Sequence, residues 1–391
     1  MSPSKNDWNR IRVTGSSASL SFQNTKIEGA VDGIRFENGG SGLISTCTLR
    51  TNSTGIYCSL SDTIKITINN CYFNNNNYGI YTYNSATEIT NCTIDGSSYG
   101  IRSYYGYSQN WTPDFKDNVI KNSTAYGIYL YNSSPTLSGN LILSNHQGIV
   151  QFYDCNSVYY DNTISNSTYY GMACYAGPDP ILRQDANGQS GHNKIIYNGQ
   201  YGIKVSGNSK PELGNLNMSN GGINSIHSNT SYEIFNYGSA SINAMQNWWD
   251  NPSGPLSSEI YGNVATYPHL TEDPEGGDPY SASSMQTNIT ADIGLPAEIT
   301  AALEQETKGN YNAAAGLFKQ FILEHKGSKF SSYAAAHYVK SILSYLKHDE
   351  AITQFEVLLA EKLDDESSYE LLAAQSNCYV RINQSEKRLT N

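Results

Sequence analysis

A glycine followed by an apolar residue recurs along the chain and sets its hydrophobic pattern. The residue after the glycine is Ile in most copies, and the residue two positions further on lies on the same face of a strand, because side chains alternate. Glu233 takes the glycine position in one further copy. The pattern predicts one short strand per copy, with alternate side chains in a common core. The glycines are Gly33, Gly55, Gly79, Gly100, Gly127, Gly148, Gly171 and Gly202.

The spacing of these glycines, 21 to 31 residues, predicts a solenoid. Units of this length bury an apolar face only by stacking on their neighbours. Leucine-rich repeats have a similar length, but each contains a helix-forming half. The segments between the glycines instead contain Asn-rich corners such as NNCYFNNNNYG. Asn and Gly favour tight turns, so we expect a mainly β chain of strands joined by turns, as in a parallel β-helix.

Three further features identify a known repeat family. Coils of the type YGIYLYNS recur, the segments DPILRQDANGQSGHNKIIYN and KPELGNLNMSNGGINSIHSN are offset by 31 residues, and NWWDNPSGP is followed by GNVATYPHL. These features resemble the right-handed parallel β-helix repeat family of the pectin-lyase-like superfamily, particularly its NosD-like and cell-surface members. The resemblance implies a right-handed β-helix over residues 1–270, closed by a last coil in which Trp248 and Trp249 cover the apolar layer.

The pattern changes period near the C-terminus. Residues 271–291 form an acidic segment with Gly and Pro, which is typical of a linker. Its carboxylates are candidates for calcium binding, but their spacing matches no recognised loop. No metal or other cofactor is therefore predicted. The carboxylates are Glu272, Asp273, Glu275 and Asp278.

From residue 292 to 391, apolar residues recur at spacings of three and four, which predicts helices. Tyr311, Ala314 and Phe318 are echoed 37 residues later by His348, Ala351 and Phe355. This segment resembles a tetratricopeptide-like helical module, although that repeat is usually 34 residues long. Such a module is a candidate site for self-association or for a protein partner.

Charge and hydropathy exclude several classes of function. The formal net charge is -11 and no basic cluster occurs, which argues against a nucleic-acid partner. No apolar run is long enough to span a membrane. Met1 leads directly into polar sequence, so we expect a mature or truncated fragment of an exported protein, extracellular or at the cell surface.

Cys47, Cys71 and Cys92 occupy one register, eight residues before the glycine in consecutive coils. Parallel strands lie roughly 4.8 Å apart, so these side chains should stack. Because three thiols cannot all pair and no His or carboxylate shares the register, we predict a buried column of free thiols rather than disulfides or a metal site.

Aromatic residues recur at two outward positions, four and two residues after the glycine. Such a ladder offers ring faces and phenol groups to a sugar chain, but cross-strand aromatic pairs also stabilise a sheet without any ligand. Both interpretations stay open. The ladder consists of Tyr83, Tyr104, Tyr131, Phe152 and Tyr175, with Tyr81 and Tyr129 beside it. A further column directly before the glycine is interpreted as corner packing: Tyr78, Tyr99, Tyr126, Tyr170, Tyr201 and Tyr232.

Features of an enzyme are sparse. The adjacent carboxylates Asp364 and Asp365 lie in the helical tail, away from any predicted cleft. One loop brings together acid, base and cation, but the segment 31 residues later replaces these residues with others, which favours a recurring structural loop. No catalytic residue is therefore predicted, and the alternative set is Asp179, Arg183, Asp185 and His192.

Three functions fit these observations. The first is a secreted or cell-surface protein without catalysis, which binds a polysaccharide or cell-surface glycan through the aromatic ladder. The second is a polysaccharide-active lyase, hydrolase or epimerase that uses the loop containing Asp179. The third is a self-assembling subunit of an extracellular structure. Fold alone does not choose among them.

Overall fold

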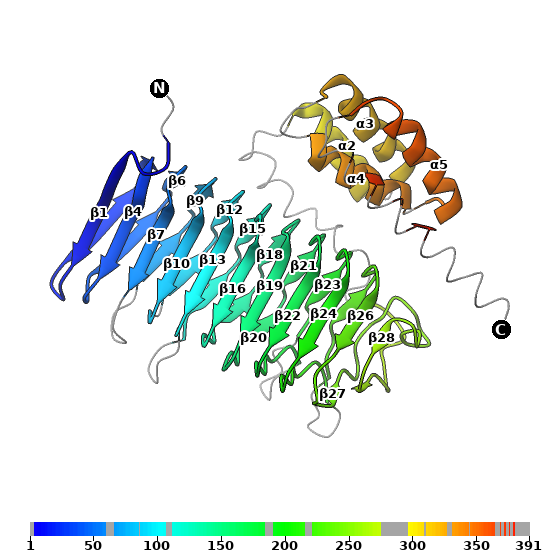
Figure 1. Cartoon of the computed structure of the whole chain (residues 1–391), viewed down its shortest axis with the longest axis horizontal. Coiled ribbons are helices and arrows are strands. Elements are labelled where there is room, and N and C mark those ends of the chain that lie inside the picture. Colours follow the sequence, from blue (N-terminus) through cyan, green and yellow to red (C-terminus); the bar gives the residue numbers. More distant parts are fainter. Residues whose placement is uncertain are drawn as a thin grey trace. The chain divides into compact units, whose positions relative to one another are not determined.

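The computed structural model divides the chain into two compact units, residues 1–276 and 277–391. It describes residues 4–59, 66–85, 87–106, 112–183, 191–215, 221–274, 296–308, 310–326, 331–343 and 345–363. A few isolated positions near the C-terminus are also described: 368, 371–372, 375 and 378–379. In the first unit, the described strands of successive coils stack side by side into three long parallel sheets (Figure 1).

Sheet A, with 11 strands among the described residues, carries the glycine repeat. Its order is β1 (Trp8–Thr14), β4 (Ala30–Glu37), β7 (Thr54–Ser59), β10 (Tyr78–Tyr83), β13 (Tyr99–Tyr104), β16 (Tyr126–Tyr131), β19 (Gln147–Phe152), β22 (Tyr170–Tyr175), β24 (Tyr201–Ser206), β26 (Tyr232–Asn236) and β28 (Ile260–Tyr261).

The other two parallel sheets, B and C, contain fewer strands among the described residues than sheet A. Sheet B contains β2 (Ser19–Gln23), β5 (Ser41–Ser45), β8 (Ile66–Asn69), β11 (Thr87–Thr90), β14 (Asp114–Lys116), β17 (Thr136–Ser138) and β20 (Val158–Tyr160). Sheet C contains β3 (Lys26–Glu28), β6 (Thr48–Arg50), β9 (Tyr72–Asn74), β12 (Thr93–Asp95), β15 (Val119–Lys121), β18 (Leu141–Leu143), β21 (Thr163–Ser165), β23 (Lys194–Ile196) and β25 (Ser225–His227). A small pair, β27 (Ile242–Asn243) and β29 (Val264–Ala265), follows.

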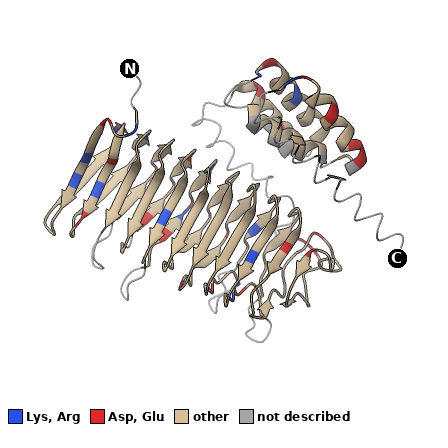
Figure 2. Ribbon diagram, viewed as in Figure 1, with Lys and Arg blue, Asp and Glu red and all other residues tan. Residues whose placement is uncertain are grey.

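This arrangement confirms the predicted fold, a mainly β, right-handed parallel β-helix followed by short helices. The residue after each glycine lies in register with its counterpart in the next coil, as Ile80 does with Ile101 and Ile128. These side chains are fully buried, so they form the apolar column that the pattern predicts. Figure 2 shows how few charged residues interrupt the strands.

The glycines keep adjacent coils close. A Cβ atom at Gly100 would lie 2.5 Å from the carbonyl oxygen of Gly127 and 2.5 Å from a methyl carbon of Ile120. Real Cβ atoms do not approach other atoms so closely, so only hydrogen fits there. The repeat of glycine therefore reflects the space between neighbouring coils.

A column of hydrogen-bonded side chains lies inside the corner between sheets B and C. The backbone N–H of each residue donates to the side chain at the same position of the next coil. Asn118 N–H, for example, donates to Oδ1 of Asn140 at 3.0 Å, and Asn140 N–H donates to Oδ1 of Asn162 at 3.1 Å. All these amides are buried. We call this column the inner ladder; its members are Cys47, Cys71, Cys92, Asn118, Asn140, Asn162, Asn193, Asn224 and Asn247.

The three predicted thiols are thus the first rungs of the inner ladder. They are free and buried, as predicted. The Sγ atom of Cys71 accepts the N–H of Cys47 at 3.5 Å, and Sγ of Cys92 accepts the N–H of Cys71 at 3.4 Å. The thiols therefore do more than fill space, because they take the hydrogen-bonding place of asparagine.

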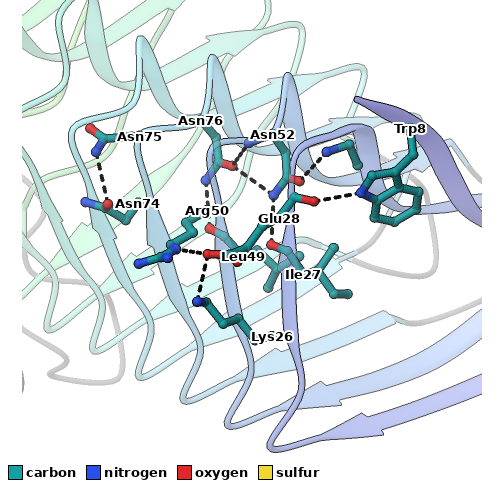
Figure 3. A network of polar contacts seen from close by, with 11 residues as sticks. Trp8, Lys26, Ile27, Glu28, Leu49, Arg50, Asn52, Asn74, Asn75 and Asn76 are labelled. Carbon is teal, nitrogen blue, oxygen red and sulfur yellow. Dashed lines mark hydrogen bonds and ion pairs between the residues drawn. The ribbon is translucent and has the colours of Figure 1, made fainter. Parts of the chain in front are cut away.

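A second ladder lies between sheets C and A. Figure 3 shows its first rungs, where Asn52 N–H donates to Oδ1 of Asn76 at 2.9 Å and Nδ2 of Asn76 donates to the carbonyl of Leu49 at 2.9 Å. At the far end, buried Glu233 accepts a hydrogen bond from Nδ2 of Asn229 at 2.5 Å. Glu233, which occupies the glycine position of its coil, therefore ends the second ladder with a carboxylate.

The native protein is expected to resist thiol reagents at pH 8. Every cysteine is buried, so a reagent cannot reach the thiols. Burial also raises the pKa of the Cys58 thiol to about 12 and that of Cys155 to about 11, whereas hydrogen bonding with Cys92 lowers the pKa of Cys71. The reactive species is the thiolate, so a colorimetric disulfide reagent should label no cysteine within minutes until urea is added. Rapid labelling of the folded protein would contradict the buried thiol column, and labelling in urea serves as the control.

The last coil contains the predicted closing motif. Trp248 and Trp249 are both buried, and Trp249 packs in the apolar core of the solenoid. Of the predicted linker, residues 275–291 lie outside the described residues, together with Glu275 and Asp278. Asp273 accepts a hydrogen bond from the hydroxyl of Ser225 at 3.1 Å.

The second unit is helical. It contains α2 (Ala297–Thr307), α3 (Tyr311–Glu324), α4 (Ser331–Leu343) and α5 (His348–Leu359), which share an apolar core that includes Phe318, Ile342 and Phe355. None of the described helices combines the length and the apolar character needed to cross a membrane.

Candidate functional site: an aromatic face and a polar groove

The outer side of sheet A carries aromatic rings in three parallel columns, which we call the aromatic face. Successive strands hold these positions in register; Tyr83, for example, pairs with Tyr104 and Tyr104 with Tyr131. The left column, directly before the glycine position of each coil, contains Tyr78, Tyr99, Tyr126, Tyr170, Tyr201 and Tyr232. The middle column contains Tyr57, Tyr81, Tyr129, Phe235 and Tyr261. The right column contains Tyr83, Tyr104, Tyr131, Phe152 and Tyr175.

The right column is the ladder predicted from the sequence. Its rings pack as pairs: the centroids of Tyr104 and Tyr131 lie 5.1 Å apart and those of Phe152 and Tyr175 lie 5.0 Å apart, both stacked. These four side chains are half-buried, whereas 41% of Tyr83 is exposed. The rings therefore support one another and still present surface to solvent.

The left column belongs to the same face, which differs from its interpretation as separate corner packing. Tyr99 contacts Tyr129 of the middle column with centroids 5.9 Å apart, and Tyr201 stacks on Phe235 at 4.5 Å. The strands begin one residue before the glycine, so these tyrosines stand on the outer side of sheet A rather than in the turn.

Arg102 lies in the middle column and organises the tyrosines around it. Its guanidinium donates hydrogen bonds to the hydroxyls of Tyr78 at 2.9 Å and Tyr104 at 2.6 Å. The guanidinium carbon also lies 4.7–5.7 Å from the centroids of five tyrosine rings, within cation–π distance; the nearest is Tyr104 at 4.7 Å. Burial raises the pKa of Tyr99, so this phenol stays neutral at physiological pH. The cation thus holds the surrounding rings in place.

Lys204 repeats this arrangement further along sheet A. Its Nζ atom lies 4.6 Å from the centroid of Tyr170 and donates a hydrogen bond to the Tyr170 hydroxyl at 3.1 Å. From β7 to β26, strands that the structure describes in full, Arg102 and Lys204 are the charged residues at outward positions, and no carboxylate stands there. The face is therefore weakly positive on an acidic protein.

Two of the four alternative catalytic residues, Asp179 and Arg183, contact the next coil. Asp179 accepts a hydrogen bond from the backbone N–H of Lys210 at 2.7 Å, and Nε of Arg183 lies 2.6 Å from the carboxylate of Glu212. Lys210 and Glu212 both belong to the segment KPELGNLNMSNGGINSIHSN, which repeats the segment of Asp179 and Arg183 after 31 residues. His192 is half-buried with a φ of 39°, and Asp185 lies outside the described residues. Among the residues that the structure describes, no three His, Cys, Asp or Glu side chains gather to hold a metal ion.

A polar groove of about 720 Å³ runs along the corner between sheets A and B, beside the right column. It extends over four coils, from the turn after β10 to the turn after β19. It was not predicted from the sequence, although two signals are present. Asn84, Tyr105 and Asn132 each lie five residues after the glycine of their coil, and a second aromatic residue follows the ladder position in Tyr104-Tyr105. Its lining includes Asn84, Tyr105, Asn132, Ser134, Asp154 and Asn156.

Comparison with known proteins supports the fold. The sequence profile of a family described as a right-handed β-helix region matches residues 4–114 and 83–248. A search of curated protein sequences finds no match.

Solved structures that match the chain include the periplasmic alginate epimerase AlgG, with 15% identity and a TM-score of 0.45 over 67% of this chain and 76% of that one. A point mutant of AlgG matches with 18% identity and a TM-score of 0.44, and the match covers 61% of each chain. The catalytic domain of a GH87 α-1,3-glucanase, solved with tetrasaccharides, matches with 10% identity and a TM-score of 0.22. That match covers 66% of this chain and 61% of the glucanase domain.

Proposed function

This chain belongs to the right-handed β-helix family, whose fold serves many activities, so we propose its function from the candidate site. We propose that it is a non-catalytic protein that binds a glycan along the aromatic face. The observation that carries the proposal is the stacked and partly exposed right column, Tyr104 with Tyr131 and Phe152 with Tyr175. Sugars bind to such surfaces through their C–H faces, while phenol groups bond their hydroxyls.

The dimensions of the face fit an extended ligand. Five consecutive strands carry the right column, and neighbouring parallel strands lie roughly 4.8 Å apart. The column therefore extends for about 19 Å, the length of a short oligosaccharide. Arg102 and Lys204 hold the tyrosines beside it through hydrogen bonds to the hydroxyls of Tyr104 and Tyr170. Rings held in this way lose little further freedom when a ligand binds, which favours affinity.

The absence of catalysis is part of the proposal. Asp179 and Arg183 bind Lys210 and Glu212 of the next repeat, so the loop that contains them supports the stacking of coils. Glycoside hydrolysis requires two carboxylates across the scissile bond, and the outward positions from β7 to β26, all described, contain none. Binding without turnover accounts best for this surface.

Replacing both Tyr104 and Tyr131 by alanine tests the proposal. Retention on a polysaccharide array should be abolished, because the central stacked pair of the right column is lost. The free energy of unfolding should fall by about 3 kcal/mol or more, because six ring contacts are lost, at ~0.5–1.5 kcal/mol for each aromatic pair removed. The array measures the first effect and urea unfolding the second.

The control is Tyr345→Ala, which removes a more exposed ring, 41% accessible, from the helical unit. This variant should be retained like the unmodified protein. If the Tyr104 and Tyr131 double variant lost stability but kept its retention, the rings would serve packing alone. Failure of the unmodified protein to bind any polysaccharide of a broad array would reject glycan binding altogether.

The proposal extends to the location and the second unit. We place the protein outside the cytoplasm, where polysaccharide ligands occur; its seven cysteines are free and buried, so they are protected from oxidation there.

Helices α2 to α5 pack in series on one apolar core, which supports a tetratricopeptide-like unit that binds a protein partner or a second copy. The NosD-like and cell-surface relationship belongs to the same proposal.

A further inference from the structure

The polar groove and the aromatic face meet at two exposed tyrosines. The ring centroid of Tyr105 lies 5.6 Å from that of Tyr83 and 5.7 Å from that of Tyr131. Two coils further on, Tyr153 contacts Tyr131 with centroids 5.0 Å apart. Tyr105 is 41% and Tyr153 44% exposed. The two rings therefore form a border that is accessible from the groove and continuous with the right column.

Both tyrosines stand in an unfavourable backbone conformation. Their φ angles are 51° for Tyr105 and 62° for Tyr153, in the left-handed region that bulky residues rarely adopt. The equivalent corner positions of the alternate coils contain Asn84 and Asn132, with φ of 47° and 46°. Asparagine adopts this conformation readily. Residues other than asparagine also adopt this conformation at corners outside the groove, for example Ala176 and Tyr197, so the conformation belongs to the turns in general. Tyr105 and Tyr153 are distinguished by their ring contacts with the right column.

The floor of the groove has polar groups available to a ligand. The carboxylate of Asp154 is exposed and makes no hydrogen bond or ion pair within the described residues, and the side-chain amide of Asn156 is likewise unengaged there. Their backbone is held in place: Asp154 N–H donates to Oδ1 of Asn132 at 3.2 Å, and Asn156 N–H donates to the hydroxyl of Ser134 at 2.9 Å. The volume, about 720 Å³, falls within the range of small-molecule sites, roughly 300–1,000 Å³.

We propose that this groove is a second subsite, which binds an uncharged sugar of the glycan that lies on the aromatic face. The inference rests on the proposed function and adds the class of ligand. Tyr105 and Tyr153 contact the C–H face of the sugar, while Asp154 and Asn156 exchange hydrogen bonds with its hydroxyls. The carboxylate of a uronate at this position would be repelled by Asp154. The groove therefore selects neutral hexans over polyuronates.

The first test is the double variant Tyr105→Asn and Tyr153→Asn, measured on immobilised β-1,3-glucan, β-1,4-mannan, α-1,4-glucan and alginate. Retention on the neutral hexan that the unmodified protein binds should fall about tenfold or more, because two ring contacts are lost. The melting temperature should fall as well, because Tyr105 and Tyr153 contact rings of the right column, although asparagine fits the left-handed corners better. Unchanged retention despite a lowered melting temperature would show that the rings serve packing and would overturn the inference.

The second test is Asp154→Ala, which removes an exposed carboxylate without disturbing the backbone bonds of the turn. It should weaken retention on the neutral hexan about tenfold and reduce the discrimination against alginate. Unchanged retention in all groove variants, with loss in the Tyr104 and Tyr131 variant, would reject the subsite and leave the aromatic face as the site. If the unmodified protein bound none of the four polymers, the inference would fall together with the proposed function.

Discussion

Asn140→Ala is expected to lower the free energy of unfolding of the solenoid by about 4 kcal/mol. Oδ1 of Asn140 accepts hydrogen bonds from both N–H and Nδ2 of Asn118, and its Nδ2 donates to the carbonyl of Phe115 at 2.7 Å. Each buried polar group left without a partner costs about 1–3 kcal/mol. Domains are stable by only about 5–15 kcal/mol, so this loss is large. Urea unfolding followed by tryptophan fluorescence measures it.

Tryptophan fluorescence is suited to this test, because all four tryptophans, Trp8, Trp111, Trp248 and Trp249, belong to residues 1–276. The matched variant is Asn140→Cys, which should cost about half as much as alanine, since a thiol both accepts and donates. Cys71 already does so in the same ladder, where its Sγ accepts the N–H of Cys47 and donates to the carbonyl of Asn69 at 3.2 Å. Equal stability of the alanine variant and the unmodified protein would contradict the role of the inner ladder.

Gly100→Ala is expected to destabilise the solenoid by about 3 kcal/mol, although alanine normally stabilises a folded chain relative to glycine. The added Cβ would lie 2.5 Å from the carbonyl oxygen of Gly127, which is fixed in the next strand. The coils must therefore separate locally, which loses packing and lengthens hydrogen bonds in sheet A. The same urea titration measures the change.

The control for this substitution is Gly316→Ala in α3. No atom lies within 4 Å of the Cβ that would be added there, and alanine is the better helix former by about 1 kcal/mol. This variant should leave the tryptophan-detected transition unchanged and raise the stability of the helical unit, measured by circular dichroism at 222 nm. A harmless Gly100→Ala would mean that the glycine repeat does not reflect contact between coils.

The sequence predicted the solenoid because its strongest signal, glycine followed by Ile, lies on the strands whose register builds sheet A. Alternation then placed residues such as Ile101 inside and Tyr104 outside without any knowledge of the other sheets. Of the inner ladder, only the stacked thiols Cys47, Cys71 and Cys92 were predicted, and its asparagine rungs were not. Asparagine at a turn and asparagine in a buried column give the same sequence pattern, and only the structure shows that Asn118 and Asn140 point inward.

The candidate site was predictable in part for the same reason. Its right column follows the strand period, and the structure places Tyr131 and Phe152 in register as that period requires. The groove was not predicted. Asn84, Tyr105 and Asn132 share one register, five residues after the glycine of their coils, whereas Asp154 lies six residues after Gly148, and the sequence does not show that these turns line one groove.

The inner ladder has a consequence for the evolution of this protein. The segment from Asn118 to Gly139 is one complete coil, and its first residue bonds the residue that follows its last, Asn140. Duplication of the matching gene segment would insert a whole coil whose hydrogen-bonding partners already exist at both junctions. Each such event would lengthen sheet A by one strand, roughly 4.8 Å. The number of strands in sheet A is therefore inherited as a number of copies, which recombination can change without redesign of the interior.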